Sequence, residues 1–327
     1  DVAGTLELRQ AIVNKFKRDN SLTYTSGQIL VSSGAKHGLY NLAQALINPG
    51  DEVIIPAPYW VSYPDIVALA QGKSVFIESK IDTQFKITPE QLEAAITDKT
   101  KLLILNSPSN PTGSCYSKQE LAELGKILRK YPQVYILSDD IYEYLTFTAE
   151  PFYNIVTACP DLYERTIVFN GVSKGYSMTG WRIGYAAGNE QIIKCMKKIQ
   201  SQNTSNPCSI SQAAALEAIG GSQDFPHELN RVFKQRHDAL YNALASIDGV
   251  KAFASSGSFY SFPDFSGVIT RLGLKDDLEL TALILDKALV SLVPGSAFGA
   301  PGCMRFSFTH DTGVLLEAVE RIKQAIA

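Results

Sequence analysis

Short apolar runs rich in β-branched residues alternate with helical stretches between residue 29 and about residue 225. Gly, Pro, Asn or Ser bounds most of the runs, as is typical of strand ends. Strands that are apolar along their whole length belong in a mostly parallel sheet with helices on both faces. We therefore expect strands at residues 29–32, 52–55, 74–77, 101–105, 134–137 and 166–169, and helices that begin near residues 35, 63 and 117.

The pattern changes after about residue 225. A long amphipathic helix is expected at residues 225–245 and another at residues 278–289, separated and followed by short apolar segments and a last helix. These features are typical of a smaller α+β domain. The sequence thus predicts an α/β protein with a large domain at residues 1–225 and a small C-terminal domain at residues 226–327.

The composition of the chain argues against several classes of function. The net charge is −3, with no basic stripe and no apolar run of the ~18–20 residues that a membrane span needs, so we expect neither nucleic acid nor a membrane as partner. Five cysteines without a CxxC pair indicate free thiols and a cytoplasmic location, and the spacing of the four histidines predicts no metal site. A helical pattern begins at residue 6, so we expect a further segment upstream of residue 1.

Polar and Gly- or Pro-rich clusters follow five of the predicted strands directly. They are Ser32–Gly38, Pro56–Trp60, Asn106–Gly113, Ser138–Tyr142 and Asn170–Gly175. Ligands of open parallel sheets bind beyond the carboxyl ends of the strands. We therefore expect all five clusters to converge on one edge of the sheet.

A phosphate site is predicted where Gly34, Ala35 and Lys36 open a helix. Free backbone N–H groups and the helix dipole hold a phosphate well at such a place, although an ordinary turn has the same appearance. Neither a Walker motif nor GxGxxG is present, which disfavours nucleotide sites of those kinds. Arg182, in Thr-Gly-Trp-Arg-Ile-Gly-Tyr, is a candidate clamp for the same phosphate.

Lys174 follows a predicted strand in a segment without acidic residues from Arg165 to Asn189. A solvated surface charge is the ordinary role of a lysine. In this Gly-rich, nearly uncharged setting, however, Lys174 is a candidate for a lowered pKa and for Schiff-base chemistry.

Asp139 ends another predicted strand, where it can either cap the next helix or face a pyridinium nitrogen, with Tyr142 near enough to donate to a phenolate oxygen. Asn110-Pro111 is either a simple turn or a rigid support that holds an amide over a site, through a cis peptide bond.

Together these segments resemble the class I aminotransferases, the fold-type-I enzymes that use pyridoxal 5′-phosphate, and most of all the bacterial aspartate aminotransferases of the Iβ kind. The likeness extends from Asp1 to the C-terminus. Its motifs are Pro-Tyr-Trp-Val-Ser-Tyr-Pro, Asn-Ser-Pro-Ser-Asn-Pro-Thr-Gly, Ser-Asp-Asp-Ile-Tyr-Glu, Ser-Lys-Gly-Tyr-Ser-Met-Thr-Gly-Trp-Arg-Ile-Gly-Tyr and Met-Arg-Phe-Ser-Phe.

The resemblance implies pyridoxal 5′-phosphate as cofactor and assigns a role to each residue around its ring. Lys174 would carry it as a Schiff base and move the substrate proton. Asp139 would pair with the pyridine nitrogen, and Tyr142 and Asn110 would hydrogen-bond the phenolic oxygen. Trp60 would stack on the ring, and Trp60 and Asn110 would also border the substrate.

It further implies that the turn at Gly34, the amides of Ala35 and Lys36 and the guanidinium of Arg182 would hold the phosphate. Arg305 would bind the substrate α-carboxylate, and the Lys36 side chain would bind the distal carboxylate of an acidic substrate. The expected reaction moves the amino group of an amino acid, most of all aspartate, to 2-oxoglutarate by a ping-pong mechanism in a homodimer.

The chain departs from the family pattern in two respects, and several alternative functions remain open. The family has a further N-terminal segment that covers the site, and it usually has Asp-Glu where this chain has Asp139-Asp140. Prephenate, aromatic or alanine-type aminotransferases and a C–S β-lyase share the scaffold. A catalytically silent ligand-binding module is the alternative from another class.

Overall fold

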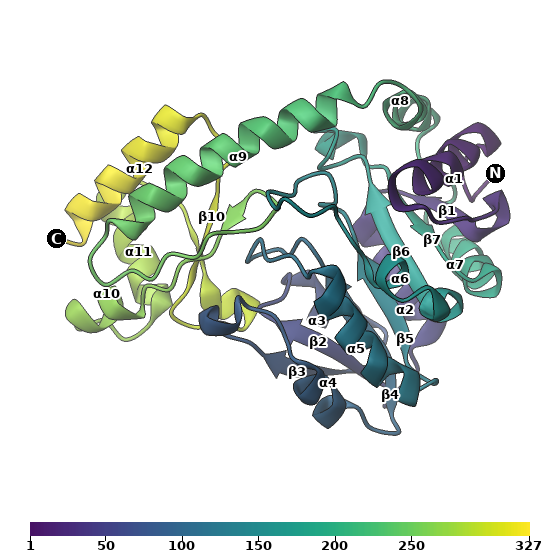
Figure 1. The fold of residues 1–327 in the computed structure, drawn as a ribbon, viewed down its shortest axis with the longest axis horizontal. Helices are drawn as coiled ribbons and strands as arrows, with labels where there is room; N and C mark the ends of the chain where they lie inside the picture. The colour runs from purple at the N-terminus through teal and green to yellow at the C-terminus, as the bar shows by residue number, and fades with distance from the viewer.

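A seven-stranded sheet forms the centre of the larger of two lobes in the computed structural model, which describes residues 1–327 (Figure 1). Its strand order is β1-β7-β6-β5-β4-β2-β3, and only β7 runs antiparallel to its neighbours. The carboxyl ends of the other six strands therefore lie at one edge. The strands are β1 (Ile29–Ser32), β2 (Glu52–Ala57), β3 (Lys73–Glu78), β4 (Thr100–Asn106), β5 (Tyr135–Asp139), β6 (Thr166–Gly171) and β7 (Gly184–Ala187).

Helices cover both faces of this sheet. Buried side chains of α1, α4, α5, α6 and α8 pack on one face in a cluster of 32 residues, and those of α2, α3 and α7 pack on the other in a cluster of 21. The helices are α1 (Leu6–Asn20), α2 (Ala35–Leu46), α3 (Ser62–Leu69), α4 (Pro89–Ala95), α5 (Lys118–Lys130), α6 (Ile155–Ala158), α7 (Glu190–Asn203) and α8 (Ser209–Gly220). The expected α/β architecture is confirmed.

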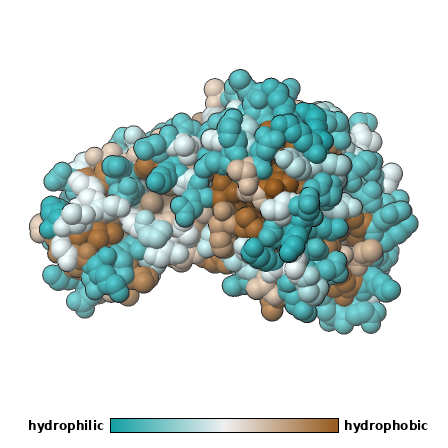
Figure 2. All heavy atoms as spheres, turned by 90° about the horizontal axis from the view of Figure 1, so that it is seen from below, coloured by the Kyte–Doolittle hydropathy of each residue, from teal (hydrophilic) through white to brown (hydrophobic).

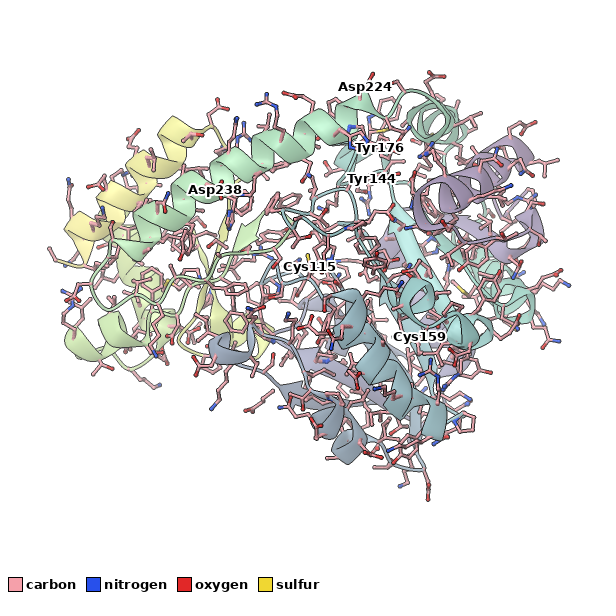
Figure 3. The ribbon with its side chains drawn as sticks, viewed as in Figure 1. Cys115, Tyr144, Cys159, Tyr176, Asp224 and Asp238 are labelled. Atoms are coloured by element: carbon pink, nitrogen blue, oxygen red, sulfur yellow. The ribbon has the colours of Figure 1, made fainter.

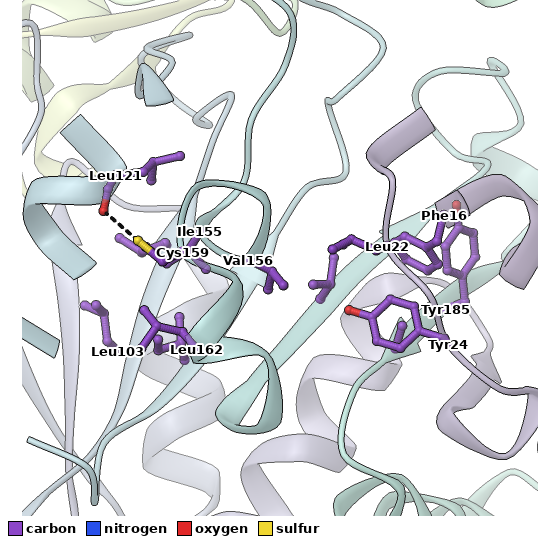
Figure 4. Close-up of a cluster of buried hydrophobic side chains, with 14 of the residues drawn as sticks. Phe16, Leu22, Tyr24, Leu103, Leu121, Ile155, Val156, Cys159, Leu162 and Tyr185 are labelled. Atoms are coloured by element: carbon purple, nitrogen blue, oxygen red, sulfur yellow. Dashed lines mark hydrogen bonds between the residues drawn. The ribbon is translucent and has the colours of Figure 1, made fainter. Parts of the chain in front are cut away.

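The larger cluster combines aliphatic and aromatic packing (Figure 4). The ring of Phe16 meets Tyr24 and Tyr185 edge-on, with centroids 5.1 and 5.9 Å apart. At the other end of the cluster, the Cys159 thiol donates to the carbonyl oxygen of Leu121 over 3.8 Å. This core fixes the strands whose carboxyl ends carry the polar clusters.

A charged network ties α1 to the turn after β5. Lys15 is fully buried and pairs with the buried Glu143, and its Nζ also donates to another residue of α1, Asn20, over 2.8 Å. Beside it, Tyr176 donates to the Tyr144 hydroxyl over 3.2 Å (Figure 3). Charged and phenolic groups thus hold the turn after β5, which directly follows Asp139 and carries Tyr142.

The smaller lobe begins with α9 (Asp224–Ala245), which crosses from the larger lobe to the far end of the molecule (Figure 1). A three-stranded antiparallel sheet of order β8-β10-β9 packs with the helices around a cluster of 21 buried residues. That cluster includes Tyr142 and Leu145 from the turn after β5. The remaining elements are β8 (Tyr260–Ser261), α10 (Ser266–Arg271), α11 (Asp277–Ala288), β9 (Val293–Pro294), β10 (Met304–Ser307) and α12 (Thr312–Ala325).

All six predicted strands are present within about two residues of their expected bounds. The antiparallel strand β7 was not predicted, because Gly184–Ala187 is short and contains no β-branched residue. One of the short apolar segments expected after the helix at residues 225–245 is residues 250–253. It forms only an isolated bridge, between Lys251 and Asp264. The division into domains at residue 225 stays a prediction.

None of the helices combines the length and the apolarity that a membrane crossing requires.

Candidate active site

A cavity of about 380 Å³ opens at the carboxyl edge of the sheet, between the two lobes. All five polar clusters contribute to its lining, as expected, and Tyr260 and Arg305 of the smaller lobe complete it. The predicted site residues that line it are Ala35, Lys36, Trp60, Asn110, Asp139, Tyr142, Lys174, Arg182 and Arg305. Gly34, the remaining one, lies directly beneath Arg182.

One end of the cavity is built to hold an anion. The helix α2 begins at Ala35 after Gly34, which has a φ of 85° and leaves the helix without a side-chain cap. A Cβ on Gly34 would collide with the Arg182 guanidinium, and a Cβ on Gly184 of β7 would collide with the Ala35 nitrogen. These glycines let the guanidinium approach a helix start whose first N–H groups lack intrahelical partners. Together the N–H groups, the helix dipole and the guanidinium fit a phosphate dianion.

A carboxylate lines another part of the same cavity. Asp139 is buried, and its oxygens accept hydrogen bonds from the Tyr63 hydroxyl over 2.6 Å and from the Ile141 backbone nitrogen over 3.3 Å. Burial raises the pKa of Asp139 to about 6, although these hydrogen bonds and the charge of Lys174 oppose the shift. A cationic N–H group placed beside Asp139 would keep the carboxylate ionised at neutral pH.

Asp140 is turned away from the cavity. Its oxygens accept from the Ser138 hydroxyl over 2.7 Å and from the Asn154 amide over 2.6 Å. Burial raises the pKa of Asp140 to about 7. Of the two adjacent acids, only Asp139 can therefore meet a ligand in the cavity.

Lys174 presents its amine to the cavity from the segment after β6. Its Nζ lies 5.2 Å from the centre of the Phe259 ring and 5.9 Å from that of Tyr142. Burial lowers the pKa of Lys174, and the positive charges of Arg182 and Arg305 lower it further, against the opposing effect of Asp139. A lowered pKa makes the neutral, nucleophilic amine available nearer to physiological pH.

Arg305 is fixed by contacts that leave it without an acidic partner. Its Cζ lies 4.5 Å from the ring centre of Tyr260 and 4.9 Å from that of Phe298. Its Nη1 donates to Oδ1 of Asn110 over 2.9 Å, and the bond between Asn110 and Pro111 is cis. A guanidinium that is oriented but unpaired is suited to bind a carboxylate with two parallel hydrogen bonds.

Lys36 and Trp60 form a further wall. The Nζ of Lys36 lies over the Trp60 ring, 4.8 Å from its centre, and that ring meets Tyr63 edge-on. Lys36 makes no ion pair within the chain, so its charge is available to an acidic ligand.

Eight of the 17 lining residues were not predicted as site residues, and Tyr63, Asn106 and Tyr260 are among them. Asn106 donates from Nδ2 to the Asp139 carbonyl over 3.0 Å and accepts from the Asn110 nitrogen over 2.8 Å, so it braces two neighbouring strand ends. Tyr63 lies three residues after Trp60, within the motif Pro-Tyr-Trp-Val-Ser-Tyr-Pro, and this motif was the signal that could have identified it.

The comparisons with known proteins agree with this geometry. The sequence model of the family "Aminotransferase class I and II" matches residues 1–322. The chain is 52% identical to the aspartate/prephenate aminotransferase of Nitrosomonas europaea, over all of this chain and 84% of that protein. It is 45% identical to the aspartate aminotransferase of Bacillus subtilis, over 99% of this chain and 82% of that protein. The crystal structure of the aspartate aminotransferase from Rhizobium meliloti superposes with a TM-score of 0.96 at 44% identity, over 99% of this chain and 82% of that one.

Proposed function

The chain belongs to the class I and II aminotransferases, and on this premise we propose that it uses pyridoxal 5′-phosphate to transfer the amino group of aspartate to 2-oxoglutarate. The observation that carries the proposal is the content of one cavity. It combines an amine with a lowered pKa at Lys174, a buried acid at Asp139 and an anion-binding helix start at Ala35.

The three groups match the three parts of the cofactor. When bound, pyridoxal phosphate supplies an aldehyde that condenses with amines and an electron-poor ring that accepts the electrons left by a departing Cα proton. The amides of Ala35 and Lys36, with Arg182, would hold the phosphate, as the cradle around Gly34 permits. Asp139 would keep the ring nitrogen protonated.

The phenolic side of the ring would meet two hydrogen-bond donors. Tyr142 lines the cavity, and burial holds its pKa well above the ordinary value, so its hydroxyl stays protonated and can donate. The Oδ1 atom of Asn110 is engaged by Arg305, which leaves the Nδ2 group of Asn110 to donate. Trp60 would stack on the ring.

The Lys174 amine, which lines the cavity and has a lowered pKa, would remove the Cα proton of the substrate and return it, which is general acid–base catalysis at contact range. Binding of the α-carboxylate by Arg305 would fix which bond of Cα is broken. Since both half-reactions use the same cavity, the proposed kinetics are ping-pong.

The choice of aspartate rests on Lys36 and on the names of the relatives. A cation over the Trp60 ring suits a second carboxylate, and the Bacillus subtilis relative is named aspartate aminotransferase. Prephenate is a second candidate acceptor, because the Nitrosomonas europaea relative is named for both substrates and prephenate also carries a distal carboxylate.

A homodimer is also part of the proposal. Val61 lines the cavity and Trp181 precedes Arg182, yet both side chains are more than a third exposed. Figure 2 shows further apolar side chains on the surface of both lobes. Large apolar side chains in such positions are typical of surfaces that a partner covers. Analytical ultracentrifugation tests the dimer, and a monomer at micromolar concentration would refute it.

The direct test of the function is Lys174→Ala in the cofactor-loaded protein. Borohydride reduction and mass spectrometry should find the cofactor covalently attached to the peptide of Lys174 in the parent and no adduct in the variant. Activity with aspartate and 2-oxoglutarate should fall by at least about 10²–10⁴-fold, the contribution of a positioned acid–base group. An adduct on another lysine, or parent-like turnover, would remove the central assignment.

A further inference from the structure

The short turn η5 (Gly295–Phe298) connects β9 to the segment before β10 and lies where the two lobes meet. Glycine is required at both of its ends. A Cβ on Gly295 would collide with the Ala300 carbonyl oxygen, and a Cβ on Gly299, whose φ is 74°, would lie 2.7 Å from the Tyr59 ring. The turn is therefore packed tightly against both lobes.

A buried carboxylate holds this turn. Asp277, the first residue of α11, is fully buried, and its oxygens accept from the hydroxyl of Ser296 and, over 2.7 Å, from the backbone nitrogen of Ser296. The cap of α11 is supplied instead by Asp276, which accepts from the nitrogens of Leu278 and Glu279. The helix therefore does not need Asp277 as its cap. Burying a carboxylate costs free energy unless hydrogen bonds compensate for it. We therefore infer that the contact between Asp277 and Ser296 serves to hold the turn.

The turn η5 also contacts two parts of the candidate active site. Phe298 is buried, and its ring lies 4.9 Å from the Arg305 Cζ. Its carbonyl oxygen accepts from the Tyr59 nitrogen over 3.0 Å, directly before Trp60. One residue of η5 thus contacts both the guanidinium proposed to bind the α-carboxylate and the segment that carries the aromatic wall.

We propose that the Asp277–Ser296 pair is a positioning device for substrate binding: it fixes η5, and through Phe298 it sets the orientation of the Arg305 guanidinium. The inference rests on the proposed role of Arg305. The guanidinium would hold the carboxylate in the ground state and the transition state alike, and a carboxylate that is bound would still present the same Cα bond to Lys174. Loosening the guanidinium therefore removes mainly uniform binding, which raises KM and leaves kcat largely unchanged.

The test uses Ser296→Ala, Ser296→Thr and Asp277→Asn in the cofactor-loaded protein. Ser296→Ala and Asp277→Asn should each raise KM for aspartate and for 2-oxoglutarate about tenfold, which corresponds to about 1.4 kcal/mol, with kcat within about twofold of the parent. Ser296→Thr keeps the hydroxyl and should restore the parent KM. The double variant should match either single one, because both changes break the same contact.

A binding measurement independent of turnover accompanies the kinetics. Calorimetric titration with succinate, an unreactive dicarboxylate, should show the same loss of affinity. Ser307→Ala is the matched control, because its hydroxyl lies on β10 near Arg305 but contacts only Thr309, so its KM should stay at the parent value. Thermal unfolding of every variant shows whether it is folded.

Two outcomes overturn the inference: a KM within about threefold of the parent in Ser296→Ala, or a loss of kcat alone, which a merely structural role would produce. Arg305→Lys separates this failure from that of the proposed function. If Arg305→Lys raises KM and Ser296→Ala does not, the positioning role is wrong and the function stands. If Arg305→Lys leaves KM unchanged, the assignment of the α-carboxylate to Arg305 is itself wrong.

Discussion

Removal of one hydroxyl, by Tyr63→Phe, tests how the buried acid is tuned. The Tyr63 hydroxyl donates to Asp139 over 2.6 Å and stabilises its charged form. A hydrogen bond to a charged group contributes about 1.5–3 kcal/mol. At 1.36 kcal/mol per pKa unit, its loss should raise the pKa of Asp139, which is about 6 in the parent, by about 1–2 units.

The sign of the expected effect follows from which form is active. In its proposed role, Asp139 must be ionised to keep the ring nitrogen of the cofactor protonated, so activity should be present above the pKa of Asp139 and should be lost as the pH falls through it. The acid limb of the kcat/KM profile of Tyr63→Phe should therefore move to higher pH by about 1–2 units, with activity near the parent value above it. A bound cationic ring lowers the pKa of Asp139 in both proteins, so the difference between the two profiles is the quantity measured.

Tyr24→Phe is the matched control for this experiment. The Tyr24 hydroxyl is buried but has no hydrogen-bond partner, so the same atom is removed without touching Asp139. Its pH profile should superpose on that of the parent. If the acid limb of Tyr63→Phe also superposes on the parent limb, Tyr63 does not tune the acid and the reasoning is refuted.

Two further substitutions test the ends of the cavity. Gly34→Ala places a methyl group against the Arg182 guanidinium and strains a positive φ at a cost of about 1–3 kcal/mol. The affinity for the cofactor, measured by absorbance titration, should therefore fall at least about tenfold. An unchanged affinity would show that Gly34 is not part of the phosphate site. Lys36→Met keeps the length of the side chain over Trp60 and removes its charge. The KM for aspartate should then rise about tenfold while that for alanine, which has no distal carboxylate, should not change; an equal rise for both would contradict the assignment.

Much of the fold could be predicted because the apolar runs are long and unbroken. Residues 166–169, for example, are β-branched or aromatic and become the buried strand β6 (Thr166–Gly171). Strand β7 could not be predicted in the same way. Its four residues, Gly184–Ala187, are small apart from Tyr185, and it is a strand only because β1 and β6 lie on either side of it.

The site residues that could be predicted are those that follow a predicted strand, and those brought in by contacts between distant parts of the chain could not be predicted. Asp139 and Lys174 could be proposed because each follows a predicted strand, where the fold class alone places ligands. Tyr63 and Asn106 contact Asp139 from 76 and 33 residues away in the chain. Phe298 reaches Arg305 through a turn in a region for which the sequence predicted only short apolar segments. Contacts of this kind depend on the strand order, which periodicity does not contain.

Asp139 and Asp140 show how much of the chemistry depends on strand register. Successive residues of a strand point to opposite faces, so one acid enters the cavity while the next is enclosed by Ser138 and Asn154. The register places Asp139 opposite Asn106 of β4. A slip of one residue would send Asp140 into the cavity and separate the Tyr63 hydroxyl from its acceptor. The burial of the apolar core residues of β4, β5 and β6 fixes this register. The proposed role of Asp139 therefore depends on those core residues as well as on the carboxylate itself.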